Sequence, residues 1–292
     1  MSKKALVISF SGGRTSAYMT YRLLKDWKGR YNNTYVVFSN TGQEHEKTLE
    51  FVNLCDTKMG FSSYWIEASV NPEPGKGTGF RLVNYSSASR DGQPFEAVIA
   101  KYGIPFSKSP HCTRELKEYP IRSFVRSLGL KNGEYDMAIG IRADEVDRVN
   151  LGGMETKGLI YPLVSWGIKK QDVLEWWSHQ DFDLEIPEHL GNCVWCWKKS
   201  FKKLATVYRE NPSYFDFPAR MEKEYGRSGP LAARLKKDVK PFRGWKGVDH
   251  IANIAESDME SYTDEWWEQQ GGCGGESCEV FTSDGSESVL DE

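Results

Sequence analysis

The chain has 292 residues, of which 39% are hydrophobic and 13% aromatic, enough to build one large core or two unequal cores. Its formal net charge of −3 does not give the overall basic field that is typical of many nucleic-acid-binding proteins. No apolar run approaches the ~20 residues of a membrane-spanning helix. The short apolar stretch after the first lysines runs into SGGRTS, not into a cleavage site. We therefore expect a cytoplasmic protein with no membrane contact.

The first part of the chain alternates between strand and helix patterns. The apolar run 5–10 ends near two glycines and predicts a buried strand, and the β-branched and aromatic run 34–39 predicts a second. Apolar residues at near-helical spacing predict helices over 15–27 and 44–59, and the run 63–68 predicts a third strand. This β-α-β-α-β order is typical of a parallel sheet with helices on its faces.

The middle of the chain continues this pattern, and the last third becomes helical. Residues 70–92 are rich in Gly, Pro, Asn and Ser and predict a long loop. The further predicted elements are helices over 94–102, 113–128 and 170–179 and a strand over 135–141. Past residue 190 the sequence is helical, basic and aromatic, and predicts no further strand.

These patterns predict an α/β fold with three parts. A doubly wound, mostly parallel sheet occupies residues 1–185, and a smaller helical region that contains cysteines occupies 186–270. Residues 271–292 are rich in Gly and acids and predict a flexible tail. Five acids and no bases lie within 279–292, so the tail is acidic and the body is close to neutral.

A glycine-rich turn follows the first predicted strand. Ser11, Gly12, Gly13 and Ser16 stand where that strand gives way to a helix. Glycines let the backbone approach an anion closely, and the helix N-terminus offers unpaired N–H groups and partial positive charge. Neither G-x4-G-K-[ST] nor G-x-G-x-x-G is present. The turn predicts a phosphate site; the alternative is a tight turn whose glycines serve geometry alone.

Five segments in order resemble one protein family. They are S-G-G-x-x-S at Ser11–Ser16, S-N-T-G-Q-E at Ser39–Glu44, H-C-T-R-E-L-K at His111–Lys117, G-I-R-A-D-E-V-D-R at Gly140–Arg148, and Y-P-L-V-S-W at Tyr161–Trp166 with Asp172 and Val173. Together they resemble the PP-loop superfamily of adenine-nucleotide α-hydrolases, and within it the phosphoadenosine phosphosulfate (PAPS) reductase family. The resemblance covers residues 5 to about 200 and implies a Rossmann-like PP-loop fold.

The resemblance also implies an adenine-nucleotide site, with ATP or a related nucleotide as the cofactor. The implied nucleotide-binding residues are Ser11, Gly12, Gly13, Arg14, Thr15, Ser16, Asn40, Thr41, Gly42, Gly140 and Arg142, and the implied catalytic residues are Ser11, Ser16, Arg142 and Arg148. ATP-cleaving members usually carry Asp where this chain has Thr15, which bears on the positioning of Mg²⁺ or water. Both glycines of the loop are kept, which leaves room for a longer phosphate chain and favours ATP.

Two groups of basic residues are candidates for anion binding. Arg142 and Arg148 follow a predicted strand end, and a guanidinium donates two parallel hydrogen bonds to phosphate or sulfate. The alternative is a loop of mutually paired surface charges. Lys198, Lys199, Lys202 and Lys203 form a second group, either a solvated face or a surface for an anionic small-molecule or nucleic-acid substrate.

The cysteines suggest a metal centre. Cys193 and Cys196 form C-x2-C, a spacing that brings two thiolates to one metal. The resemblance implies a [4Fe–4S] cluster on Cys112, Cys193 and Cys196, with His111 in place of a fourth cysteine. Structural zinc on the same four residues and buried thiols without metal are the alternatives. Cys55 is expected to be a core residue.

Two further cysteines lie in the acidic tail. Glycines flank Cys273 and Cys278, so either thiol could swing into an active site, as the nucleophilic cysteine of sulfonucleotide reductases does. The E-C-G-L-H motif of those reductases is absent, and incidental thiols in a disordered tail are the alternative.

The expected function is ATP cleavage at the α-phosphate, by which an acceptor is adenylylated and pyrophosphate released, with coupling to sulfur transfer. One alternative is reduction of APS or PAPS by Cys273 or Cys278 with a thiol reductant. The other is an adenine-nucleotide-binding protein without catalysis. A sulfur donor or thiol reductant is thus an expected partner beside the nucleotide.

Overall fold

The computed structural model describes residues 4–73, 75–242, 244–257, 259–261 and 263. The predicted tail over 271–292, with Cys273 and Cys278, lies outside the described residues.

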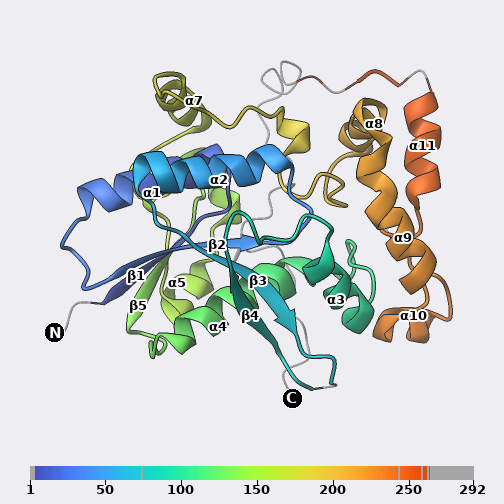
Figure 1. The fold of residues 1–292 in the computed structure, drawn as a ribbon, viewed down its shortest axis with the longest axis horizontal. Helices are drawn as coiled ribbons and strands as arrows, with labels where there is room; N and C mark the ends of the chain where they lie inside the picture. Colours follow the sequence, from blue (N-terminus) through green and yellow to red (C-terminus); the bar gives the residue numbers. More distant parts are fainter. Residues whose placement is uncertain (1–3, 74, 243, 258, 262, 264–292) are drawn as a thin grey trace.

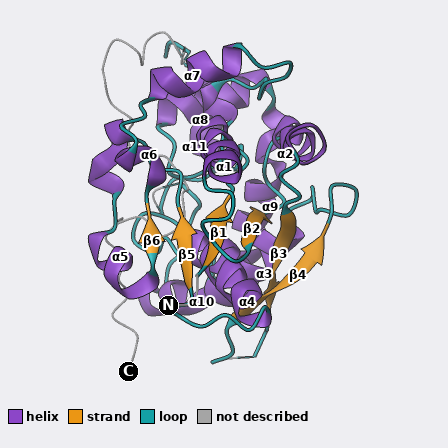
Figure 2. Cartoon of the chain, turned by 90° about the vertical axis from the view of Figure 1, so that its left-hand side faces the viewer, coloured by secondary structure: helices purple, strands orange, loops and turns teal. Residues whose placement is uncertain are grey.

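The centre of the molecule is a six-stranded sheet in the order β4-β3-β2-β1-β5-β6, seen in this sequence across Figure 2. The strands are β1 (Ala5–Ser9), β2 (Thr34–Asn40), β3 (Tyr64–Val70), β4 (Thr78–Val83), β5 (Tyr135–Ala138) and β6 (Leu159–Ile160). All neighbours pair in parallel except β3 and β4, which are antiparallel. The chain moves outward from β1 to β2 and β3 in one direction and then to β5 and β6 in the other. Ligands of open parallel sheets bind at such a reversal, outside the carboxyl ends of the strands.

Side chains of β1 alternate between two apolar clusters, one on each face of the sheet. Leu6 and Ile8 join one cluster, and Ala5 and Val7 join the other. The first cluster receives side chains of α1 (Arg14–Asp26), α2 (Glu46–Met59) and α7 (Lys170–Ser178), and the second those of α4 (Tyr119–Ser127). Helices therefore cover both faces of the sheet (Figure 2).

The last third of the described chain is helical, and its helices lie beside one end of the sheet (Figure 1). They are α8 (Phe201–Glu210), α9 (Asp216–Tyr225), α10 (Gly229–Leu235) and α11 (Val248–Glu256). Leu204, Phe215 and Ile251 belong to the same apolar cluster as Leu6 and Ile8. The first large cluster thus runs from β1 into α11.

Most predicted elements are confirmed, with small differences at their ends. The remaining helices are α3 (Gln93–Tyr102), α5 (Leu151–Lys157) and α6 (Pro162–Ser165), and a π-helical turn (Arg114–Glu118) opens the helix predicted over 113–128. The loop predicted over 70–92 is wrong in part, since β4 lies within it and pairs with β3. The predicted strand over 135–141 ends at Ala138, and β6 was not predicted. Among the described residues, no helix combines the length and the apolar character that crossing a membrane requires.

Candidate nucleotide site and cysteine cavity

The glycine-rich turn lies at the carboxyl end of β1, where the strand order reverses. Gly12 has φ +80°, and a Cβ there would meet side-chain atoms of Thr48, Phe38 and Val52 at 3.0–3.1 Å. Only glycine fits this conformation and this space. Gly13 begins α1 as its N-cap, and no side chain caps the helix. The turn therefore leaves the positive end of the α1 dipole open to an anion.

Two serines close the turn. The hydroxyls of Ser11 and Ser16 lie 2.9 Å apart, and the Ser11 amide donates to Ser16 Oγ at 3.2 Å. The Ser16 hydroxyl donates in turn to the carbonyl of Gly13 at 3.0 Å. Ser16 is fully buried, so these bonds hold both ends of the turn in one shape.

Arg142 reaches the same turn from the segment after β5. Its Nη1 donates to Thr15 Oγ1 at 3.1 Å, and its Nε donates to Asp144 at 3.0 Å. A Cβ on Gly140 would lie 3.2 Å from the Cα of Ser16, so glycine permits this close approach. The predicted arginine and the predicted turn are thus brought together.

Arg148 lies behind Arg142 in the same short helix (Ala143–Arg148). Its Nη1 donates to Glu145, which also pairs with Arg142 at 3.4 Å. Its Nη2 is buried and has no hydrogen-bond partner among the described residues. The two arginines are thus paired with acids of their own segment, as in the alternative that the sequence left open. Both are less than 10% exposed, however, so these ion pairs are buried and do not lie on the surface.

Arg14 turns away from the glycine-rich turn. Its guanidinium donates to both carboxylate oxygens of Asp183, at 2.7 and 2.9 Å, and to the carbonyl of Leu184. Trp177 Nε1 donates to the carbonyl of Arg14 at 2.9 Å. Arg14 therefore anchors the start of α1 to the segment after α7. Sequence reasoning missed Asp183, which lies 169 residues away.

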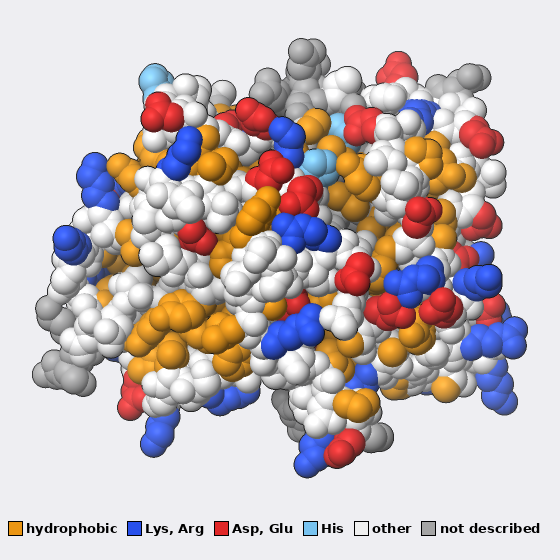
Figure 3. Space-filling model, in the orientation of Figure 1, with side chains coloured by type: hydrophobic (Ala, Val, Ile, Leu, Met, Phe, Trp, Pro, Cys, Tyr) orange, Lys and Arg blue, Asp and Glu red, His pale blue; other side chains and the backbone are white. Residues whose placement is uncertain are grey.

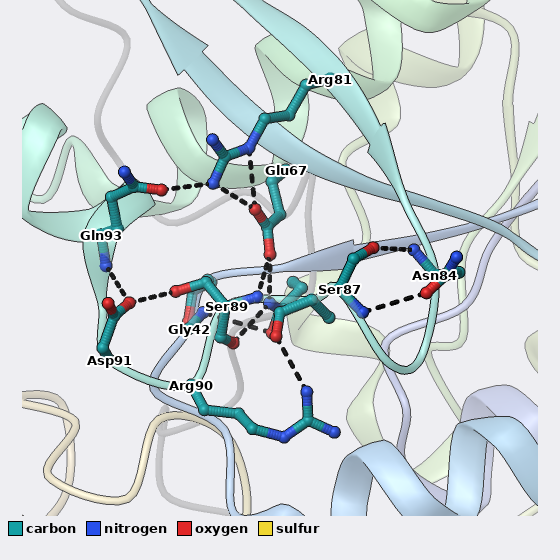
Figure 4. A network of polar contacts seen from close by, with 12 residues as sticks. Gly42, Glu67, Arg81, Asn84, Ser87, Ser89, Arg90, Asp91 and Gln93 are labelled. Atoms are coloured by element: carbon teal, nitrogen blue, oxygen red, sulfur yellow. Dashed lines mark hydrogen bonds and ion pairs between the residues drawn. The ribbon is translucent and has the colours of Figure 1, made fainter.

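A second polar cluster holds the end of β2, as Figure 4 shows. The Asn40 side-chain amide donates to Glu67 Oε1 at 2.6 Å and to the carbonyl of Ser89 at 2.9 Å. Asn40 Oδ1 accepts from the amide of Gly42 at 3.2 Å. Gly42 has φ +79°, and a Cβ there would lie 2.7 Å from Ser89 Oγ. Asn40 and Gly42 are therefore fixed against the 84–93 loop.

Glu67 is the centre of this cluster, and sequence reasoning missed it. It is fully buried in β3. Besides Asn40, its Oε1 accepts from the amide of Ser89 at 2.6 Å, and its Oε2 accepts from Arg81 at 2.7 and 3.0 Å. Its one sequence signal was a lone acid in the otherwise uncharged strand YWIEASV.

The 40–44 segment also joins the C-x2-C segment. Thr41 Oγ1 donates to Glu44 at 2.9 Å and lies 3.4 Å from Cys193 Sγ. The amide of Val194 donates to the carbonyl of Gln43 at 3.0 Å, and Trp195 Nε1 donates to Gln43 Oε1. Residues implied in nucleotide binding and residues implied in metal binding are therefore neighbours.

Three of the four predicted metal ligands line one cavity. Cys112, Cys193 and Cys196 share its wall with Thr41, Phe95, Thr113, Leu116, Lys117, Trp195 and Trp197, and the cavity has a volume of about 20 Å³, room for about one water molecule. All three cysteines are buried, and no disulfide joins them to each other or to Cys55. The hydroxyl of Thr113 is buried and has no hydrogen-bond partner among the described residues. Among the residues that the structure describes, no three His, Cys, Asp or Glu side chains lie close enough together to bind one metal ion.

His111, the predicted fourth ligand, has other partners. Its Nε2 lies 3.1 Å from the carbonyl of Gly103, which can only accept, so Nε2 carries the proton and Nδ1 accepts from Ser109 Oγ at 3.2 Å. Burial, reinforced by the positive charge of Arg114, lowers the pKa of His111 to about 4. The ring is therefore neutral, and both nitrogens are engaged.

The lysine group after the C-x2-C is largely structural. Lys199 and Lys203 are buried. Lys199 Nζ donates to the carbonyls of His189 and Val194, and Lys203 Nζ pairs with Glu188 at 3.0 Å. These two lysines hold the cysteine segment in place. Cys55 is buried in α2, and burial raises the pKa of its thiol well above the usual range.

Comparison with known proteins gives one clear relationship. No protein-family model matches the chain. The chain is 31% identical over 284 residues to the uncharacterized nin region protein ORF290 of Escherichia phage lambda, and the alignment covers 94% of each protein. The chain belongs to the same family as this phage protein.

Proposed function

We propose that this protein binds ATP at Ser11–Ser16 and cleaves it at the α-phosphate, transferring an adenylyl group to an acceptor and releasing pyrophosphate. The bond between the α-phosphorus and the bridging oxygen breaks as the acceptor attacks, and pyrophosphate leaves with the electron pair. The doubly wound PP-loop fold of PAPS-reductase-like enzymes is part of this proposal. The order of the strands around β1 supports it.

The observation that carries the proposal is the pairing of an uncapped helix N-terminus with a buried arginine. The start of α1 has no side-chain cap, and Arg142 contacts Thr15 in the first turn of that helix. Backbone N–H groups and a fixed guanidinium stabilise charge that develops on a transferring phosphoryl group. Both need little rearrangement at the moment of reaction, which is favourable for catalysis.

The proposal does not require the protein itself to bind a metal ion at Thr15. Its hydroxyl already accepts from Arg142, so a cation is present where ATP-cleaving relatives carry Asp. Mg²⁺ usually keeps several waters and is held by substrate phosphates with one or two carboxylates. We expect Mg²⁺ to arrive with ATP.

The three cysteines of the cavity are the ligand set of a [4Fe–4S] cluster bound by three thiolates, and the cavity, which has room for about one water molecule, would have to widen around it. Cys112, Cys193 and Cys196 would hold it, and the orphaned hydroxyl of Thr113 would supply a hydrogen-bond donor at the cavity wall. A cluster with three protein ligands keeps one iron open to bind sulfur, which is the chemistry it would add. His111 would stay with Gly103 and Ser109. Reduced thiols and ATP both agree with the cytoplasm.

The nucleotide proposal is tested by ATP binding and by release of AMP and pyrophosphate, with cellular small-molecule and nucleic-acid fractions as acceptors. Ser16→Ala should reduce ATP affinity about 10- to 100-fold, since a hydrogen bond to a charged group contributes about 1.5–3 kcal/mol. The control is Thr20→Val, one turn further along α1, whose hydroxyl bonds only the carbonyl of Ser16, at 2.7 Å. Equal ATP affinity in wild type and Ser16→Ala would refute the site.

The products separate the alternatives. Sulfite released from APS or PAPS, and lost in a Cys273→Ser/Cys278→Ser variant, would favour the reductase. Tight binding of ATP with no AMP from any acceptor would favour the non-catalytic hypothesis.

The metal proposal is tested by anaerobic purification and elemental analysis. Iron and acid-labile sulfide in equal amounts, with visible absorbance, are expected for wild type, and loss of both for Cys112→Ser, Cys193→Ser and Cys196→Ser. Cys55→Ala is the control, since Cys55 does not line the cavity. Zinc instead of iron would refute the cluster, and so would a metal-free protein.

A further inference from the structure

A further concentration of positive charge lies outside both candidate sites. Seven Lys or Arg residues and one acid lie between Arg227 and Lys246, in a chain whose net charge is −3. This segment contains α10 and a short hairpin closed by backbone bridges from Lys240 to Gly244 and from Phe242 to Lys246. In Figure 3, Lys and Arg side chains gather at the lower right, where Figure 1 places α10.

The hairpin holds one tryptophan outward. Phe242 is fully buried in the main apolar cluster, and a Cβ on Gly244 would overlap the ring of Phe106, so the hairpin is pinned at two points. Trp245, between these anchors and Lys246, is 62% exposed. Tryptophan is enriched at interfaces, where its large ring is buried against a partner.

Several cations of the segment from Arg227 to Lys246 are not neutralised. Arg227 pairs with Asp238 at 2.7 Å and Lys240 with Glu222 at 2.8 Å. Arg234, Lys236, Lys237 and Lys246 form no salt bridge within the described part of the chain, and the first three are exposed. Lys237 is three residues from Lys240, so they lie within about 11 Å of each other. The amide of Lys240 donates to the carbonyl of Gly244 at 3.1 Å, next to Trp245, so the unpaired cations and the indole lie on one short, folded-back stretch of the chain.

We infer that this surface, defined by Arg234, Lys236, Lys237, Trp245 and Lys246, binds single-stranded nucleic acid. Lysine and arginine neutralise phosphates, and an exposed indole stacks on an unpaired base. Duplex bases are already stacked and offer no face to Trp245, which is why a single strand is favoured. The surface is distinct from the lysine group after the C-x2-C, two of whose members are buried. The inference does not depend on ATP cleavage.

The test is fluorescence anisotropy with labelled single-stranded DNA and RNA of about 20 nucleotides, which exceeds one binding site. With about four cations on phosphates, affinity should fall about 50-fold between roughly 50 and 200 mM salt. Trp245→Ala should weaken binding about 5- to 100-fold through loss of one base stack. Lys236→Glu/Lys237→Glu should weaken it at least about 10-fold and flatten the salt dependence.

The control is Lys28→Glu/Lys131→Glu, which reverses two exposed lysines near other elements and should bind like wild type. Circular dichroism and ATP binding should be unchanged in all these variants, because none lies in the nucleotide site. Three results would overturn the inference: equal binding by wild type and Trp245→Ala, tighter binding of duplex than of single strands, or binding to anionic vesicles without binding to oligonucleotides. The last result would assign the surface to lipid.

Discussion

Glu67→Ala should be among the most destabilising substitutions in the sheet. Glu67 is fully buried, and its removal leaves the donors of Asn40 and Ser89 without an acceptor. Each hydrogen bond to a charged group contributes about 1.5–3 kcal/mol. Arg81 is 45% exposed and can return to water, so its ion pair adds at most about 1 kcal/mol. We expect a loss of about 3–5 kcal/mol in the free energy of unfolding.

Glu67→Gln separates charge from shape. Its amide oxygen can still accept from Asn40 and Ser89, while its NH₂ group faces Arg81, which has room to move. We expect a cost of about 1–2 kcal/mol, clearly less than for alanine.

The assay is urea unfolding followed by tryptophan fluorescence, with ATP affinity measured on the same variants. The control is Glu134→Ala, which removes an exposed carboxylate that accepts one backbone N–H, from Lys131, at 2.8 Å. Equal stability of Glu67→Ala and Glu134→Ala would refute the reasoning. Equal losses for Glu67→Ala and Glu67→Gln would show that the charge alone matters.

Two further predictions concern the turn after β1 and the edge of the sheet. Gly12→Ala should lower the free energy of unfolding by about 2–4 kcal/mol and abolish ATP binding, because a φ of +80° is strained for alanine and the new Cβ would lie 3.1 Å from Phe38. The control is Gly60→Ala, which has φ +71° but no neighbour within 4 Å of the new Cβ. It should lower the free energy of unfolding by only about 1 kcal/mol, through backbone strain. Burial and the carboxylate of Asp136 raise the pKa of Tyr31 to about 12. Because the folded pKa lies above the unfolded value, this stabilisation is complete below about pH 10 and is lost between about pH 10 and 12. The free energy of unfolding, measured in urea, should therefore fall more from pH 8 to 11 in wild type than in Tyr31→Phe. The difference should be less than about 1 kcal/mol, because the phenol is partly exposed. Parallel pH dependences of the two proteins would contradict the assignment.

The parts of the fold with strong periodicity were predictable. Strands β1 and β2 are buried apolar runs, and α7 begins and ends within a residue of its predicted bounds. Strand β4 was missed because it lies at the sheet edge, where only one of its six residues is buried, so no buried face marks it in the sequence. Strand β6 has only two residues, too few for any period to show.

The candidate site was predictable in its residues more than in its contacts. The glycines at the end of β1 and the arginine after β5 could be brought together because carboxyl ends of parallel strands meet at one edge. The bond from Arg14 to Asp183 spans 169 residues, and no local pattern encodes it. Lys199 and Lys203 looked solvent-exposed as part of a charge run, but both are buried against partners from residues 188–194, which the charge run does not reveal.

The contacts of Gln43 and Thr41 with the C-x2-C segment have a consequence for the order of folding. They join residues 152 positions apart, and the cavity also needs Cys112 from a third segment. Closing loops of this length costs chain entropy before any contact is gained, so such pairings form late. A nascent chain that ends before Cys193 contains all six strands but leaves the end of β2 without these partners. The cysteine cavity therefore cannot be complete until residues 193–196 have been synthesised and have packed against the end of β2, and its thiols are available to solvent and to metal before that point.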